Sequence, residues 1–206
     1  MALPTSPPRR PRGQYAKTAA RRAEIVAAGL EVFSASGYHA ASLREIAEKV
    51  GLSQAGVLHH FANKWELLSA VLALRDDRSI ARVPNGGTIP GVDTVRALVD
   101  LVAYNTCIPG LIELQCALSA EATHADHPAH GYFAERYRVI IDLFTDAFGD
   151  MLTRGQLLPG VDPRSAAIRT IATMDGLQVQ WLLQRDSLDM QAEFRSAVQA
   201  LCTVEI

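Results

Sequence analysis

Closely spaced histidines are the residues that could do chemistry in this sequence. His59 and His60 end the segment SQAGVLHHF, and three further histidines recur at intervals of three in HADHPAH. Imidazoles grouped in this way can hold a metal ion or transfer protons as general acids and bases. Which of these functions is open to them depends on the elements that position them.

The adjacent pair, His59 and His60, is poorly arranged for either chemistry. Side chains on a helix converge at spacings of three or four residues, whereas adjacent ones diverge. If Val57 and Phe61 face the core, Ala55 and His59 point away from it. The face so formed is small and uncharged, with one histidine as its large polar group. Such a face suits close approach to a DNA major groove; two plainly solvent-exposed histidines are the alternative.

The second group, His124, His127 and His130, is interrupted by Pro128. With a neighbouring carboxylate the three could form a metal site, which would indicate an all-α metal-binding protein. Because the proline breaks the helix, however, the three side chains need not share a face. We therefore expect a solvated turn between two helices here, and neither a bound metal nor a cofactor.

Capping signals on either side of the first pair predict short helices. Ser42 and Glu45 have the spacing of a capping box, Ser53 can cap a second helix, and Asn63 can cap a third. Gly51 falls in the turn between the first two. Short capped helices joined by a glycine-containing turn are typical of a helix-turn-helix.

Helical patterns extend over the rest of the chain. An amphipathic helix precedes the capped ones and stops at Gly37, and a Gly/Pro-rich break follows them at Val83–Gly91. Pro128 and Pro163 occupy first-turn positions, and Asp162 precedes the second as a cap. The helices expected outside the capped segment are Ala19–Ser36, Thr94–Ile108, Gly110–Thr123, Pro128–Arg154, Pro163–Arg185 and Met190–Cys202. With no strand-like alternation, the sequence predicts an all-α fold of about nine helices.

Charge divides the chain into two parts. Residues 1–64 hold nine Lys or Arg against four Glu, a net charge of +5, and the remainder carries −7. A basic end on an acidic body indicates that only this end meets a polyanion. Residues 1–16 hold four Pro and three Arg without apolar periodicity, so we expect a disordered basic arm. We predict a helix-turn-helix domain over 17–64 and a second domain over 65–206, to which the family resemblance described below assigns effector binding and dimerisation.

Cysteine use and hydropathy restrict the class of protein. Cys107, Cys116 and Cys202 are odd in number and lack CxxC spacing, which argues against a disulfide framework or structural zinc. No apolar run approaches the ~20 residues of a membrane helix, so we expect no membrane partner. The start MALPTSPPRRPRG lacks the apolar stretch of a secretory signal, which points to the cytoplasm.

These motifs together resemble a known family. Over about residues 17–72 the sequence is similar, without a gap, to the DNA-binding domain of the TetR family of transcriptional regulators. The resemblance rests on the pair Gly37-Tyr38, on SLREIA, on the turn GLS and on the closing FANKWELL. It implies sequence-specific DNA binding, no enzymatic activity, and a palindromic operator contacted by a two-fold dimer.

The resemblance also implies roles for individual residues. Ser42 and Arg44 would face phosphate or a base, and Lys64 would bind a phosphate at a helix N-terminus. Where the family usually has a tyrosine that contacts the DNA backbone, this chain has Leu58, which cannot hydrogen-bond. The arm could enter the minor groove or add only non-specific affinity. The expected DNA contacts are Ser42, Arg44, Ser53, Gln54, Ala55, Gly56, His59, His60 and Lys64, with Arg9, Arg10 and Arg12 in the arm.

Members of this family form dimers through their last two long helices, which would be residues 163–202 here. The segment SAAIRTIATMDGLQVQWLLQ is apolar well beyond a single stripe, so it must be covered on more than one side. Gly176 would permit close helix–helix contact at a cost of up to ~1 kcal/mol. A monomer that buries this helix in its own core is the alternative.

Family members also have a ligand cavity among their middle helices. Polar or aromatic residues inside apolar helix patterns are candidates for its wall, although each could instead be an ordinary core residue. They are Tyr104, Glu113, Cys116, Tyr137, Phe144, Asp175, Gln178 and Trp181. The stretch QCALSAEATHADHPAHGYFAERY is also similar to the effector domain of the choline-repressor-type subgroup, a similarity that implies no particular ligand.

The sequence therefore predicts a homodimeric transcriptional regulator, a repressor that a small-molecule effector releases from its operator. Two alternatives remain: a regulator without a small-molecule ligand, acting constitutively or through a protein partner, and the metal-binding protein considered above. The first prediction requires an exposed recognition helix, a cavity and a dimer surface, all of which are structural properties.

Overall fold

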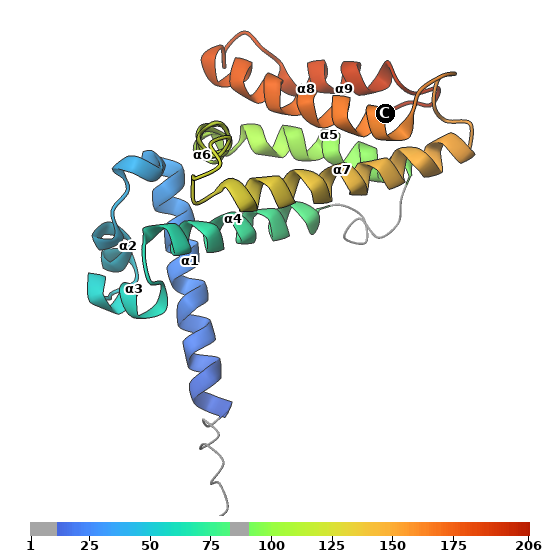
Figure 1. Cartoon of the computed structure of the whole chain (residues 1–206). Coiled ribbons are helices and arrows are strands. Elements are labelled where there is room, and N and C mark those ends of the chain that lie inside the picture. Colours follow the sequence, from blue (N-terminus) through green and yellow to red (C-terminus); the bar gives the residue numbers. More distant parts are fainter. Residues whose placement is uncertain (1–11, 83–90) are drawn as a thin grey trace, which may run out of the picture.

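The computed structural model describes residues 12–82 and 91–206, and within these ranges the chain forms nine helices and no extended strand (Figure 1). The helices are α1 (Arg12–Ala40), α2 (Leu43–Lys49), α3 (Gln54–His60), α4 (Lys64–Ile80), α5 (Val92–Thr106), α6 (Pro109–Glu121), α7 (His130–Thr153), α8 (Pro163–Leu183) and α9 (Met190–Gln199). The all-α prediction is confirmed. The predicted break at Val83–Gly91 lies, apart from its last residue, outside the described ranges.

Side-chain caps fix where the short helices begin. The side-chain oxygens of Ser42, Ser53 and Asn63 each accept a hydrogen bond from the backbone N–H three residues ahead, at 3.1, 3.1 and 2.8 Å. The carboxylate of Glu66 in turn accepts one from the backbone N–H of Ala62, at 2.6 Å. Each cap pairs a helix N–H that has no partner inside its own helix. The predicted starts of α2, α3 and α4 are therefore confirmed.

α1 is longer than predicted at its N-terminus and is interrupted where predicted. It begins at Arg12, so the expected disorder is wrong for residues 12–16. The alanines and long polar side chains of GQYAKTAARR favour helix even without an apolar stripe. Gly37, with φ 72° and ψ 172°, breaks the helix in a conformation that other residues rarely adopt.

The connection before α7 also differs from its prediction. α7 begins at His130 with Ala129 as its N-cap, so Pro128 lies before the helix rather than in its first turn. Backbone hydrogen bonds from the N–H groups of His127 and His130 to carbonyls three residues earlier hold a mostly exposed turn. The solvated turn expected at the second histidine group is therefore present.

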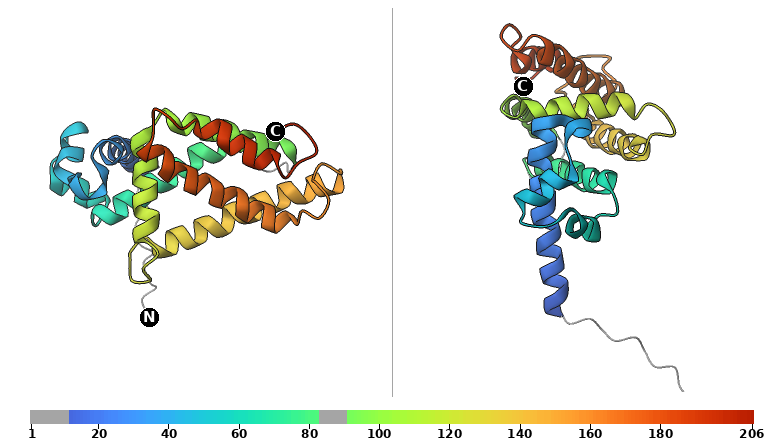
Figure 2. Two further views of the ribbon diagram at one scale, coloured as in Figure 1. Left: turned by 90° about the horizontal axis from the view of Figure 1, so that it is seen from above. Right: turned by 90° about the vertical axis from the view of Figure 1, so that its left-hand side faces the viewer.

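Aspartate caps begin the last two helices. Asp162 accepts a hydrogen bond from the backbone N–H of Ser165 at 2.8 Å, and Asp189 from that of Ala192 at 3.0 Å. The first confirms the predicted start of α8. α9 ends at Gln199, three residues before its predicted end. α8 and α9 form the upper layer of the body in Figure 1 and are the helices nearest the viewer when the molecule is seen from above (Figure 2, left).

Two hydrophobic cores meet where the helix-turn-helix joins the body. The first combines buried residues of α1 to α4 with Leu114 and Leu118 of α6 and Phe133 of α7. The second is built from α5, α7, α8 and α9, with Phe148 and Phe194 among its fully buried side chains. Since α4 and α6 contribute to the first core, packing continues across the predicted domain boundary at residue 64.

The two parts approach each other very closely at the start of α6. A Cβ built on Gly110 would be 1.6 Å from the backbone oxygen of Ser34 in α1. No other residue type fits there without moving one of the two helices. The contact therefore ties the helix that supports α2 and α3 directly to the body.

α5 and α6 meet at a bend of 106°. No single helix in the described ranges is long and apolar enough to cross a membrane. The bent pair α5 and α6 is, by length and composition only.

We predict that Gly110→Ala destabilises the protein, because the added methyl group must push α6 away from the backbone of Ser34. Overpacking of this kind costs about 1–3 kcal/mol. Chemical denaturation followed by circular dichroism measures the change in the free energy of unfolding.

Gly149→Ala in α7 is the matched control, because a Cβ there meets no described atom within 4 Å. Its stability should equal that of the natural protein or exceed it by up to ~1 kcal/mol. Natural stability in the Gly110→Ala protein would contradict the importance of the contact.

Candidate DNA interface and ligand cavities

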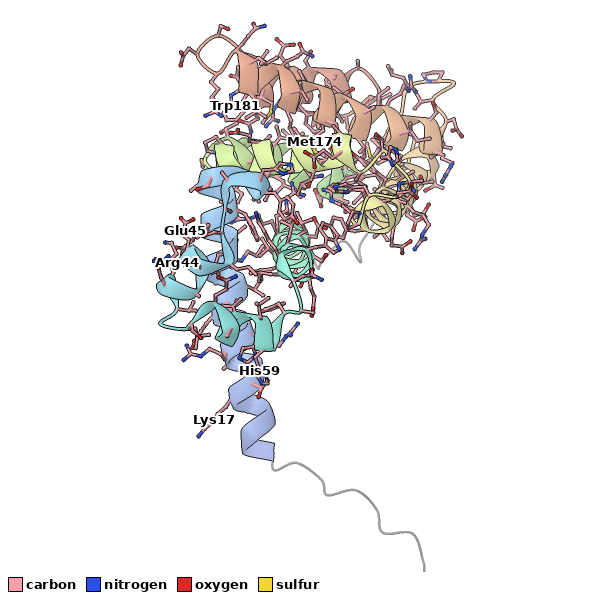
Figure 3. The ribbon with its side chains drawn as sticks, turned by 60° about the vertical axis from the view of Figure 1, so that its left-hand side comes forward. Lys17, Arg44, Glu45, His59, Met174 and Trp181 are labelled. Atoms are coloured by element: carbon pink, nitrogen blue, oxygen red, sulfur yellow. The ribbon has the colours of Figure 1, made fainter. Side chains whose placement is uncertain are left out.

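α3 presents a small exposed face on the side away from its core. Val57 and Phe61 are fully buried, as predicted, while Ala55, Leu58 and His59 are exposed. Figure 3 shows His59 at the end of the molecule that also presents Arg44 of α2. A short helix without acidic residues and with small side chains in its first turn can lie close to the base edges of a major groove.

The two adjacent histidines have different environments. Their rings lie 5.4 Å apart at 74°, but His59 is exposed whereas His60 is partly buried. The backbone carbonyl of His60 accepts a hydrogen bond from the Arg22 guanidinium of α1. Burial lowers the pKa of His60, and the charges of His59, Arg22 and Arg21 lower it further. His60 therefore gains a proton less readily than a free imidazole, and His59 is the more exposed of the two rings.

The residues expected at the start of α2 and α3 have structural tasks as well. The hydroxyls of Ser42 and Ser53 accept hydrogen bonds as caps, which leaves each O–H able to donate to a phosphate. Arg44 is exposed and its Nε donates to Glu48 at 2.9 Å. An exposed pair of this kind contributes little stability, so Arg44 can exchange Glu48 for DNA.

Lys64 lies at the N-terminus of α4, held by the residues of the turn after α1. Its Nζ donates to the backbone oxygen of His39 at 3.3 Å and lies 4.6 Å from the ring centroid of Tyr38. Burial lowers the pKa of Lys64. Tyr38 therefore orients the predicted phosphate contact. Sequence reasoning missed this role, although it singled out the pair Gly37-Tyr38.

α1 extends the basic surface past α3. The N-terminal part of this helix projects beyond the rest of the structure and presents exposed Lys17 (Figure 2, right; Figure 3). Arg12 is the first residue of α1 and so belongs to a helix rather than to a disordered arm. Arg9 and Arg10 lie outside the described residues, and their predicted minor-groove contacts stay predictions.

Four of the predicted effector residues lie together beside α6. Cys116, Tyr137, Asp175 and Gln178 line a pocket of about 310 Å³. The Tyr137 hydroxyl donates to Oδ2 of Asp175 at 2.8 Å. Burial raises the pKa of Asp175, and burial together with Asp175 raises the pKa of Tyr137 to about 12 and that of Cys116 to about 11. The carboxylate proposed to need a partner thus has one inside the protein.

The other four predicted effector residues are scattered. Phe144 lines a second, mainly apolar cavity, which we call the apolar cavity. Tyr104 lies under the guanidinium of Arg82, 3.5 Å from it, beside a small pocket of about 50 Å³. Glu113 is exposed, with Arg185 at 3.9 Å, and Trp181 is a member of the second hydrophobic core. These placements leave the role of the eight residues a prediction.

The apolar cavity, about 360 Å³, lies between α4, α5, α7 and α8. Its wall is mainly apolar, but one end carries Arg75 and Asp76 of α4 with Tyr132 and Arg136 of α7. We call these four residues the arginine cluster. Arg75 Nη1 and Arg136 Nε each lie 3.2 Å from Oδ1 of Asp76, and the Tyr132 hydroxyl donates to Oδ2. Arg75 Nη1 also donates to buried Gln115 at 3.2 Å.

Sequence reasoning missed the arginine cluster. Within LRDDR the charges look like a solvated helix surface, yet Leu68, Leu72 and Arg75 recur at the i, i+4, i+7 spacing of a buried face. Arg75 is indeed almost fully buried. The signal was therefore a charged residue in line with core leucines.

The histidines of the second group do not converge. The His127 ring lies 3.6 Å from Glu121 and accepts a hydrogen bond from the N–H of Ala129, whereas the His130 ring bonds the carbonyl of Ala122 at 2.8 Å. No group of three His, Cys, Asp or Glu residues within 12–82 and 91–206 is placed to hold a metal ion. These residues of the chain therefore offer no metal site that would support the metal-binding alternative.

Comparison with protein families assigns both ends of the chain. Residues 25–71 match the family described as bacterial regulatory proteins, tetR family, and residues 92–203 match the C-terminal domain of BetI-type transcriptional repressors. The chain belongs to the TetR family. The resemblance inferred from the sequence is confirmed for both domains.

Individual TetR proteins agree with this assignment. The transcriptional activator FasR of Mycolicibacterium smegmatis is 26% identical over 192 residues, covering 87% of this chain and 80% of its own. The regulator TtgR of Pseudomonas putida is 27% identical, covering 82% and 83%. A TetR regulator from Haloarcula marismortui shares the fold with a TM-score of 0.77 at 16% identity, covering 90% and 100%.

The protein is therefore a transcriptional regulator with a DNA-binding helix-turn-helix, and the family assignment confirms that it is not an enzyme. Leu58, which stands where TetR proteins usually have tyrosine, lies exposed on α3 and offers the DNA backbone only apolar contact.

We predict that His59 and Lys64 make different contributions to DNA binding. His59→Ala should reduce the discrimination between operator and random DNA, because its ring lies on the groove-facing side of α3. Lys64→Ala should weaken binding to both DNAs and lower the salt slope by about one. Fluorescence anisotropy on both DNAs across a salt series measures these effects, and equal losses of specificity would contradict the division.

Proposed function

We propose that this TetR protein is a homodimeric repressor that a small-molecule effector releases from a palindromic operator. The observation that supports this most is the dual position of α4. Its first turns pack Leu67, Leu68 and Leu72 into the core of the helix-turn-helix, and its later turns form a wall of the apolar cavity. A molecule in that cavity therefore touches the helix that positions the DNA-binding end.

The proposed dimer surface is a stripe along α8. Ile168, Ala172, Gly176, Val179 and Leu183 are exposed and follow each other at intervals of three or four residues. Three of them are large apolar side chains, 45%, 47% and 79% exposed for Ile168, Val179 and Leu183. A stripe with this spacing matches the seam between two packed helices. A second copy of the chain would cover it, because a two-fold axis brings the same stripe of each subunit together.

Gly176 supports the same proposal. A Cβ added there meets no atom of the described residues within 4 Å, so nothing within the described part of the chain requires a glycine. A glycine inside a helix destabilises it by up to ~1 kcal/mol. Close packing of a partner helix against Gly176 would offset this loss.

Release follows if the effector binds the non-DNA state more tightly than the DNA-bound state. A hundredfold loss of operator affinity requires a coupling free energy of ~2.7 kcal/mol, within the usual allosteric range. Moving α4 would change the spacing of the two recognition helices and so their fit to half-sites one DNA turn apart.

Repression, rather than activation, is favoured by the C-terminal match to BetI-type repressors, whereas the relative FasR is named an activator. Like other regulators that act on bacterial promoters, the protein would work in the cytoplasm. Reporter expression from its own promoter, with and without the gene, separates the two modes: repression predicts higher expression in its absence.

Binding of the purified protein to its own promoter region tests the operator. Fluorescence anisotropy across a salt series, with footprinting, should show tight, salt-dependent protection of a palindrome. Weak binding indifferent to sequence would contradict a local operator, and selection of bound genomic fragments would then locate one elsewhere.

We predict that Val179→Glu breaks the dimer, because it would bury a charge in the centre of the α8 stripe. Sedimentation velocity should show a dimer for the natural protein and a monomer for the variant. Leu58→Glu is the matched control: it introduces the same charge at an exposed apolar residue of α3, remote from α8, and should leave the dimer intact. A dimeric Val179→Glu protein would contradict this interface.

A further inference from the structure

The arginine cluster holds one more positive charge than negative. It contains two guanidinium groups and the single carboxylate of Asp76, and arginine stays protonated in proteins. The side chains of Arg75 and Arg136 are only 6% and 11% exposed. A buried charge without a counterion is strongly unfavourable. A second anion at this place would remove the imbalance.

Two N–H donors of the cluster are without acceptors. Nε of Arg75 and Nη1 of Arg136 are buried and have no hydrogen-bond partner among the described residues. Asp76 is already engaged, because its two oxygens accept from both arginines and from Tyr132. Buried donors without a partner are rare in native proteins. Because both arginines also line the cavity, a ligand with anionic oxygens that enters it could pair with these two cations.

Other acidic groups near the cavity do not supply this counterion. Glu135 is exposed and is held by Arg138 on the same helix, at 2.5 and 2.8 Å. Asp77, also at the cavity wall, is exposed. Burial lowers the pKa of Arg75 and Arg136 lowers it further, while Asp76 and the Tyr132 hydroxyl oppose this. Asp175 also interacts electrostatically with both arginines, but its Oδ2 accepts from Tyr137, and neither arginine donates a hydrogen bond to it among the described residues.

The rest of the cavity is apolar. Its wall includes Leu98 and Leu101 of α5, Ile140 and Phe144 of α7, and Ile171 and Met174 of α8. A cavity of about 360 Å³ falls within the size of small-molecule sites. It therefore offers one cationic end and one hydrophobic body to the same molecule.

We propose that the effector is an amphipathic organic anion, a carboxylate with an apolar body, bound between Arg75 and Arg136 at one end and the apolar wall at the other. The inference rests on the proposed function of this cavity as the effector site. A cationic ligand would meet two arginines, and a neutral apolar ligand would leave both N–H donors unpaired. The carboxylate is favoured because its two oxygens can accept from two donors at once.

The placement also connects the ligand to the DNA-binding end. Arg75 comes from α4, which enters the helix-turn-helix core, and Arg136 comes from α7. An anion accepting hydrogen bonds from both would fix the separation of these two helices. Neutral ligands of the same size would lack this link.

Matched probes test the charge of the ligand. Isothermal titration calorimetry on the purified full-length protein would compare decanoate with 1-decanol and decyltrimethylammonium, and 2-naphthoate with 2-naphthol. We expect at least one carboxylate to bind about tenfold or more tightly than its uncharged counterpart. Absence of a carboxylate preference in both series, including absence of all binding, would overturn the proposal.

Arg136→Gln should remove that preference, lowering carboxylate affinity roughly tenfold and leaving the alcohol unchanged. Arg169→Gln is the matched control and should keep it, because Arg169 is an exposed arginine of α8 that does not line the cavity and donates to the backbone of Ser165. Thermal melts by circular dichroism would establish that both variants fold. A preference that survives in folded Arg136→Gln would contradict the assigned end of the cavity.

Operator anisotropy with the same probes separates this inference from the proposed function. A carboxylate that binds without weakening operator affinity would support the ligand class and contradict release by the effector. Operator release by alcohols as effective as by carboxylates would support the proposed function and contradict the ligand class.

Discussion

The structure depends on one helix that belongs to two environments. α4 begins with a side-chain cap at Asn63, sends its leucines into the core beneath α2 and α3, and ends with Arg75 and Asp76 at a cavity wall. Its length keeps these two regions in one rigid element, because a helix resists bending where no proline or glycine interrupts it. A displacement of α4 at the cavity would therefore be transmitted through this helix to the core beneath α2 and α3.

Other contacts also join the two parts of the chain. α6 reaches α1 so closely that only a glycine fits at position 110, and Leu114 and Leu118 complete the core of the DNA-binding end. The buried charges of the arginine cluster add a second link, between α4 and α7, that is left short of one anion.

Local signals in the sequence predicted most of the fold. Caps at Ser42, Ser53, Asn63 and Asp162 were predictable because a cap and its helix lie within a few residues. Pro128 failed as a helix start because a proline also fits a preceding turn, and the disordered arm failed over residues 12–16 because helix propensity outweighed the missing apolar stripe. The arginine cluster escaped prediction since it unites residues from α4 and α7, which the chain separates by more than fifty positions.

The central claim is that an anion in the cavity and operator DNA on α3 bind to competing states of one dimer. The most direct test is the affinity of the bound carboxylate probe measured by calorimetry with and without saturating operator DNA. Linkage requires that DNA weaken the probe by the same factor by which the probe weakens DNA. Equal reciprocal factors well above one are predicted, and a probe affinity that DNA leaves unchanged would contradict the account.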